Sequence, residues 1–300
     1  KTQWPSIKWM KQYLRVEEQY MDRNTLDFFR IAYANPEVEP LNPELQGWRH
    51  YMDKEQGLVL MRNRFQDEND IVAAFTATAR RVHGHQGYDN LTFRILGLDN
   101  IWAIGAGRTG KVAGQTNLFP GGNIQEKRNS DVTGRLIASE FLPHGSGYAI
   151  GEGSCLGVRE HRRFFAAHYD GKSGAEALFL VADSSANGKQ WRLNTPEFNQ
   201  VELLQDGFKI TAPNGASLRA RVFQENVSFK ADTGRVPYGG KVSPRNPGIR
   251  YHGKQYAYSK WISVRCNPHI VVAMTLQKAG RKHPEMKWRP RYKVLEVNNH

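Results

Sequence analysis

The stretch from Arg81 to Phe93 reads RVHGHQGYDNLTF and lies between two segments with the composition of β-strands. Side chains alternate along a strand, so His83 and His85 would share one face, about 6–7 Å apart along the chain. Two histidines on one face suit proton transfer, metal ligation or binding of an anionic substrate. The same spacing also fits an ordinary pair of strand histidines, and the flanking sequence has to decide between these readings.

From Gly57 onward, apolar residues recur with a period of two, in short runs rich in β-branched and aromatic residues. The runs cover 57–61, 71–78, 91–96, 101–104, 163–169, 177–182, 190–193, 208–211, 217–223, 256–265 and 270–276. Tight-turn pairs such as Asp170-Gly171 and Asn214-Gly215 separate them. This pattern predicts a mainly β fold, a large antiparallel β-sandwich. Residues 111–155 are rich in glycine, which predicts loops over a binding face rather than core strands.

The N-terminal residues have a different, helical pattern, with Ile7, Met10 and Leu14 at roughly helical spacing. Three X-Pro pairs between Asn35 and Pro43 end it, because proline disfavours helix. We therefore expect a helical segment at 1–35, a proline-rich junction at 36–54 and a β-sandwich domain at 55–300. The start shows no signal peptide, and its isolated helical pattern leads us to expect that a longer protein precedes it.

The chain is basic, with a formal net charge of +13 and a pI of about 9.7. This excess would attract polyanions such as nucleic acid, acidic polysaccharide or anionic lipid. The basic residues are scattered rather than gathered in one arm, which makes nucleic acid an unlikely partner. No run approaches the roughly 18 apolar residues of a membrane span. Cys155 and Cys266 could pair or remain two buried thiols.

A basic and aromatic segment, His161-Arg162-Arg163-Phe164-Phe165, begins one of the predicted strands. It could contact a polyanion. It could equally be a charged strand edge that protects against aggregation.

The order of features from Gly57 to Leu193 resembles the C-terminal part of the heparinase II/III-like polysaccharide lyases. The matching pieces are the strand at 57–62, His83-Gly84-His85 with Asp89-Asn90 and Phe93, the segment 102–107, Arg162-Arg163, and Val181-Ala182-Asp183. The resemblance implies that residues 1–35 are the end of an N-terminal α/α toroid, packed against a C-terminal β-sandwich. It also implies a secreted or periplasmic protein.

In that family, the first histidine of the HxH pair lines the cleft and faces the uronic acid, and His83 takes that place here. The second histidine, matched by His85, often joins a later aspartate and a later histidine around a structural zinc. Those two positions fall near Ile104 and Thr116, which cannot supply the ligands. We therefore expect no metal and no other cofactor, although His144 or Asp99 could substitute.

Polysaccharide lyases act by β-elimination, in which a base removes the proton α to the uronate carboxylate. An imidazole such as His83 could serve as this base or neutralise the carboxylate. The expected substrate-binding residues are His85, Tyr88, Arg81, Arg108, Arg135 and Asn117. The family's catalytic tyrosine belongs to the toroid, so the expected partners are an acidic polysaccharide and that toroid region. The alternative is a non-catalytic carbohydrate-binding or structural sandwich that has lost the zinc site.

Overall fold

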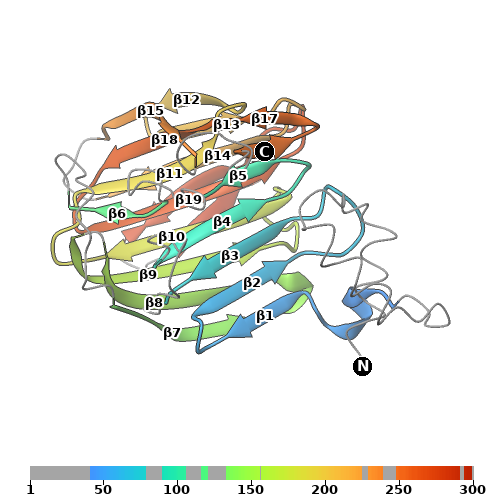
Figure 1. The fold of residues 1–300 in the computed structure, drawn as a ribbon, viewed down its shortest axis with the longest axis horizontal. Coiled ribbons are helices and arrows are strands. Elements are labelled where there is room, and N and C mark those ends of the chain that lie inside the picture. Colours follow the sequence, from blue (N-terminus) through green and yellow to red (C-terminus); the bar gives the residue numbers. More distant parts are fainter. Residues whose placement is uncertain are drawn as a thin grey trace.

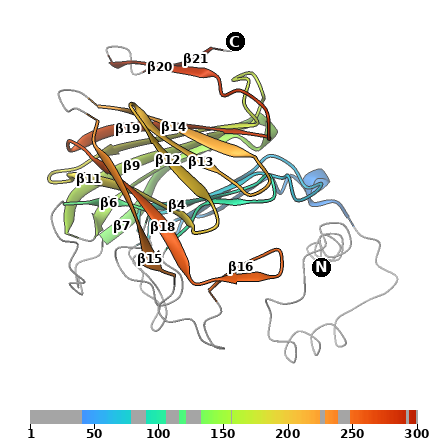
Figure 2. The ribbon, with the colours of Figure 1, turned by 90° about the horizontal axis from the view of Figure 1, so that it is seen from above.

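The computed structural model describes residues 41–78, 90–105, 116–120, 133–155, 157–224, 229–238, 248–290 and 294–298. These residues form an antiparallel β-sandwich with short 3-10 turns, including η2 (Pro43–Gln46) and η4 (Pro143–Gly145). Figures 1 and 2 show the strands stacked in layers. The predicted mainly β fold is therefore confirmed.

The first layer is an eight-stranded sheet whose neighbouring strands are all antiparallel. Its order is β12 (Gln200–Leu204), β13 (Gly207–Thr211), β14 (Ser217–Phe223), β19 (His269–Gln277), β10 (Ala177–Ser184), β9 (Val158–His168), β8 (Gly147–Cys155) and β7 (Thr133–Phe141).

The second layer joins a five-stranded meander to a four-stranded sheet. The meander runs in chain order: β1 (His50–Asp53), β2 (Leu58–Arg62), β3 (Val72–Thr76), β4 (Thr92–Leu96) and β5 (Ile101–Ala103). The four-stranded order is β15 (Ala231–Pro237), β18 (Tyr258–Arg265), β11 (Gln190–Pro196) and β6 (Leu118–Phe119). The two sheets meet where the Ile104 amide donates to the Asn194 carbonyl oxygen (2.9 Å), so β5 lies beside β11.

Two hairpins complete the described part of the chain, β16 (Ile249–Tyr251) with β17 (Lys254–Tyr256), and β20 (Glu285–Arg289) with β21 (Val294–Asn298). Figure 2 shows the eight-stranded sheet between the hairpin β20–β21 and the second layer. No described helix is long and apolar enough to cross a bilayer.

The core between the layers follows from strand alternation. In β10, every second side chain from Ala177 to Asp183 is buried. Aromatic rings meet there: the ring centroids of Phe93 and Phe165, from facing layers, are 5.1 Å apart, and those of Phe93 and Trp191, from the two sheets of the second layer, are 6.3 Å apart. Burial of each such side chain is worth roughly 1.5–3 kcal/mol, so this aromatic stack is a main source of the sandwich's stability.

The glycine-rich segment 111–155 corrects one expectation, because Thr133–Phe141 and Gly147–Cys155 are nine-residue strands rather than loops. The glycines are needed where the layers approach closely. A Cβ on Gly151 would lie 2.6 Å from the side chains of both Ala77 and Leu91, and one on Gly134 would lie 2.2 Å from Asn90 Oδ1. Here glycine marks close packing of a strand and does not mark a loop.

The β-domain also begins earlier than expected, because β1 lies inside the 36–54 segment taken as a junction. Residues His50–Asp53 pair with Leu58–Met61 and extend the meander by one strand. The predicted helical segment at 1–35 lies outside the described residues.

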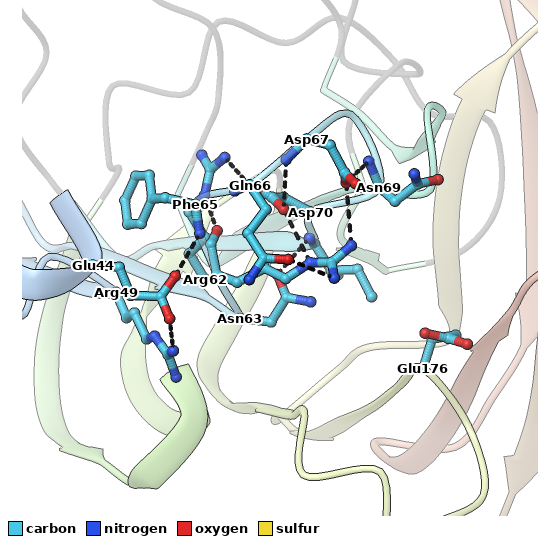
Figure 3. A network of polar contacts seen from close by, with 12 residues as sticks. Glu44, Arg49, Arg62, Asn63, Phe65, Gln66, Asp67, Asn69, Asp70 and Glu176 are labelled. Carbon is cyan, nitrogen blue, oxygen red and sulfur yellow. Dashed lines mark hydrogen bonds and ion pairs between the residues drawn. The ribbon is translucent and has the colours of Figure 1, made fainter. Parts of the chain in front are cut away.

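A polar network fixes the start of the described chain to this sheet (Figure 3). Asp70, which is almost fully buried, accepts hydrogen bonds from Arg62 Nη2 (2.7 Å) and Arg64 Nε (3.1 Å) in the loop between β2 and β3. Glu44 of η2 pairs with Arg49 and accepts from the Phe65 amide (3.1 Å). Burial alone would raise the pKa of Glu44, but these hydrogen bonds lower it overall. The network therefore docks η2 on the sandwich.

Candidate functional site

Most of the sequence-predicted site residues lie outside the described part of the chain: Arg81, His83, His85, Tyr88 and Arg108. The structure does describe the residues that flank them. Asn90 and Leu91 follow the segment 79–89, Ile104 and Thr116 lie on either side of the segment 106–115, and Thr133 follows the segment 121–132. These flanking residues define a frame for the candidate site.

Buried hydrogen bonds bring the frame residues together. The Asn117 side-chain amide donates to the Asn90 carbonyl oxygen (2.8 Å), and the Thr116 hydroxyl donates to the Ile104 carbonyl oxygen (2.7 Å). The Asn90 side chain in turn donates to the Thr133 carbonyl oxygen. Residues at the ends of three segments, 79–89, 106–115 and 121–132, are thus tied to one place beside β11.

Arg163 of β9 forms the centre of this frame. Its Nη1 donates to the carbonyl oxygens of Leu91 (2.6 Å) and Thr116 (3.3 Å), and its side chain is 0% exposed. Leu91 itself has a positive φ of 53°, a conformation that costs a non-glycine residue of order 1–3 kcal/mol. The bond from Arg163 to the Leu91 carbonyl helps hold that strained backbone in place.

Asp183 of β10 neutralises Arg163 in a bidentate pair, with 2.7 Å from Nε to Oδ1 and 2.8 Å from Nη2 to Oδ2. His161 Nε2 lies 2.7 Å from the same Oδ1. Burial by itself would raise the pKa of Asp183, but the charge of Arg163 and the contact with His161 hold it at about 2. Burial lowers the pKa of His161, so at neutral pH it is uncharged and donates its Nε2 proton to the ionised carboxylate.

The contacts of this cluster also show which of the two interpretations of the segment His161-Arg162-Arg163 applies. His161 and Arg163 point into the core, whereas Arg162 is exposed and pairs with Glu152 (3.0 Å). The interpretation as a charged strand edge is therefore wrong, because β9 lies between β10 and β8 and two of the three basic residues are buried. The signal was present in the sequence, because Arg163 shares its strand face with the apolar Phe165.

Arg135, expected to bind substrate, is not brought to the frame. Its side chain is 74% exposed and pairs with Glu152, which also pairs with Arg162. These three side chains lie on the face of the eight-stranded sheet opposite to Arg163, because Arg162 and Arg163 are neighbours in one strand.

Asn117, also expected to bind substrate, is fully buried and has a different role. Its side-chain nitrogen donates to the Asn90 carbonyl oxygen (2.8 Å), and its side-chain oxygen accepts from the Leu118 amide (2.8 Å). Both functional groups of the side chain are thus engaged within the protein. Asn117 positions the segment that ends at Asn90.

The frame does not fit the family's zinc site. Ile104 has no ligand atom in its side chain, and the Thr116 hydroxyl is shared between the Ile104 carbonyl and the Asn194 amide (3.1 Å). Asp99 is paired with His252 (2.8 Å). His144 lies in the turn between β7 and β8, at the other end of this hairpin from Thr133. Within the described ranges, no group of three His, Cys, Asp or Glu residues could hold a metal. That zinc is not bound tightly remains a prediction, since His85 lies outside these ranges.

Comparison with known proteins gives one kind of match. No protein-family model and no curated protein matches the chain. A heparinase III structure superposes with a TM-score of 0.64 at 12% identity, covering 92% of this chain and 46% of that one. A second heparinase III structure gives a TM-score of 0.54 at 13% identity, covering 79% and 38%. This chain has a heparinase-like fold.

The heparinase-like fold confirms the resemblance drawn from the sequence. At 12–13% identity the match establishes the fold and not the reaction. The chain spans less than half the length of either heparinase III structure.

Proposed function

We propose that this chain is the β-sandwich part of a polysaccharide lyase that cleaves acidic, uronate-containing glycans by β-elimination. The observation that carries the proposal is the frame around Arg163 in a heparinase-like fold. It ties Asn90 and Leu91, next to the segment of His83, to Ile104 and Thr116, which bracket Arg108. A frame that holds the flanking residues of these segments together is what a site assembled from separate parts of the chain requires.

The proposed reaction needs two kinds of group. A base takes the proton α to the uronate carboxylate, the released electron pair forms a carbon–carbon double bond, and the glycosidic oxygen leaves with a proton from an acid. A cation or hydrogen-bond donor must neutralise the carboxylate, because the α proton is otherwise too weakly acidic. We assign His83 as base or neutraliser, with Arg81, Arg108, Tyr88 and His85 on the substrate, and the remaining acid or base to an N-terminal toroid.

The alternative is a non-catalytic sandwich that binds acidic glycans. Its support is the replacement of the zinc ligands by Ile104 and Thr116. Either function suits a secreted or periplasmic protein, where such glycans are encountered, and the net charge of +13 suits an acidic ligand.

The deciding experiment compares His83→Ala with His269→Ala in the complete protein that contains this chain. Unsaturated product would be followed by ultraviolet absorbance on alginate and on glycosaminoglycans. Loss of a general acid or base typically costs 10²–10⁴-fold, so His83→Ala should lose at least about a hundredfold in kcat. His269, exposed at the start of β19, serves as the control and should retain full activity.

Two results would count against the proposal. A loss of only a few-fold in His83→Ala would reject the catalytic role of this histidine. If the complete wild-type protein forms no product from any uronate polymer but still binds these polymers, the non-catalytic alternative is favoured.

A further inference from the structure

The outer face of the four-stranded sheet carries polar residues beside two aromatic ones, Phe119 and Trp261, and it has a pocket outside the frame. Along β11 and β18, Trp191, Leu193, Ile262 and Val264 point into the core, so the residues between them point outward. Cross-strand pairing places Gln190 beside Arg265 and sets Arg192, Ser263 and Asp232 in one row on that outer face.

The pocket lies at the end of the sheet where β11 and β15 begin and β18 ends. It has a volume of about 410 Å³, within the range of roughly 300–1,000 Å³ found for small-ligand sites. Its lining residues are Lys189, Gln190, Lys230, Ala231, Asp232, Ser263 and Arg265.

Three cations surround this pocket: Lys189, Lys230 and Arg265. None of the three is ion-paired with any residue in the described part of the chain. Arg163 and Arg235, by contrast, each have a carboxylate partner. Among the lining residues that the structure describes, Asp232 is the one acid against three cations, so these residues favour an anion.

A neutral group beside these cations also suits a sugar. The Gln190 side-chain oxygen is buried and has no hydrogen-bond partner among the described residues, so it could accept a hydrogen bond from a ligand hydroxyl. Trp261, further along β18, lies outside the lining, because it pairs with Asn194 and is covered by Arg192, 4.7 Å from the indole centroid.

The position of the pocket links it to the frame. β11 runs from Gln190, in the pocket, to Asn194, whose amide donates to the Thr116 hydroxyl (3.1 Å). Four strand residues span about 13 Å, which separates the pocket from the frame.

We propose that the pocket of Lys189, Lys230 and Arg265 is a second subsite, which binds a carboxylate or sulfate group of an acidic glycan away from the reacting unit. The choice of ligand rests on the proposed function, whereas the pocket and its charge do not. A duplex nucleic acid presents its charges along a convex backbone, which fits a single hollow less well than an oligosaccharide does.

The test compares two triple variants that lose the same net charge, one variant in the pocket and one elsewhere on the surface. The pocket variant combines Lys189→Gln, Lys230→Gln and Arg265→Gln. The control variant combines Lys54→Gln, Arg281→Gln and Lys282→Gln, three exposed basic residues elsewhere. Calorimetric titration would use a heparin-derived hexasaccharide, an alginate-derived hexasaccharide, a neutral cello-oligosaccharide, sodium sulfate and a short DNA duplex.

Three exposed ionic contacts together should be worth about tenfold in affinity, so the pocket variant should bind the acidic hexasaccharides about tenfold more weakly. The control should change less than twofold, and binding should weaken with salt in the wild type more than in the pocket variant. The sulfated and unsulfated hexasaccharides distinguish a sulfate from a carboxylate contact. The neutral sugar should not bind measurably.

The proposal is overturned if the pocket and control variants bind the hexasaccharides equally well. It is also overturned if DNA binding depends on the pocket as strongly as hexasaccharide binding does, or if free sulfate binds the pocket as tightly as the hexasaccharides do. Titrating His83→Ala separates the two proposals. If His83→Ala lacks lyase activity but binds the hexasaccharides as the wild type does, the subsite is retained. If the wild type has lyase activity but the pocket variant binds the hexasaccharides as well as the wild type does, the subsite alone is rejected.

Discussion

At the scale of single residues, the pair of Asp183 and Arg163 predicts a specific pH dependence. The pKa of Asp183 is lowered from 3.8 to about 2 in the folded chain. A lowered carboxyl pKa adds stability that is fully present above the unfolded value and is lost as pH falls through the folded value. That shift corresponds to about 2 kcal/mol, lost between about pH 4 and pH 2.

The measurement is urea unfolding of wild type and Asp183→Asn at several pH values. At neutral pH the variant should be less stable by roughly 3–5 kcal/mol, because Arg163 would be left buried without a counter-charge. This difference should narrow by about 2 kcal/mol between pH 4 and pH 2. Glu202→Gln, at an exposed position of β12, is the control and should change the free energy of unfolding by less than about 0.5 kcal/mol at neutral pH. A difference for Asp183→Asn that stays constant from pH 4 to pH 2 would contradict the assignment.

The same residues show what the sequence could reveal. Alternation with Phe165 indicates that Arg163 faces inward, and an inward arginine requires a carboxylate. The register of β9 against β10 makes Asp183 this carboxylate, and no local sequence pattern predicts that register. For the same reason the sequence did not show the partners of Arg135 and Asn117, both expected on the substrate: Arg135 forms an exposed ion pair with Glu152, and Asn117 donates to the Asn90 carbonyl oxygen.

At the scale of elements, the glycines of β8 predict a packing effect. Gly151→Ala would bring a methyl group within 2.6 Å of the Ala77 and Leu91 side chains. Overpacking of this kind typically costs 1–3 kcal/mol, so the free energy of unfolding should fall by roughly that amount. Gly171→Asn is the control, because Gly171 has open space around it and asparagine tolerates its positive φ of 73°. Equal stability of Gly151→Ala and wild type in urea would show that the layers are further apart.

The elements that could be predicted are those with clean alternation, and those that were missed lack it. Strands such as Ala177–Ser184 were recognised because apolar side chains fill one face. Thr133–Phe141 and Gly147–Cys155 were missed because their inward positions include Gly134, Gly151 and Gly153, which leave room for Asn90 and Leu91. Whether a strand position needs glycine depends on the side chains of the facing layer. Those side chains come from distant parts of the sequence, so a local pattern does not reveal them.

At the scale of the whole molecule, the two-layer sandwich was predictable from strand number, turn pairs and the family resemblance. The frame of the site was not, because it joins Asn90, Ile104, Thr116 and Arg163 from separate strands through side-chain hydrogen bonds. These contacts exist only once both layers are in place.

The last prediction concerns the reaction as a property of a larger assembly. Three tyrosines in the described ranges are engaged away from the frame. Tyr148 packs on Phe164 and has its pKa raised by a hydrogen bond to Glu140, Tyr169 is buried and donates to the Met61 carbonyl, and Tyr251 donates to the Asp99 carbonyl. We therefore expect residues 1–300 alone to give no unsaturated product.

The measurement is the absorbance assay with the 300 residues and with the complete protein, on the same acidic glycans. The 300 residues should still bind these glycans, with affinity that falls as salt rises, because exposed charges are screened beyond about 8 Å at physiological ionic strength. Robust turnover by the 300 residues would place the catalytic tyrosine within them. Tyr88→Phe, Tyr148→Phe and Tyr251→Phe would then identify it, since phenylalanine keeps the ring and removes only the hydroxyl that exchanges the proton.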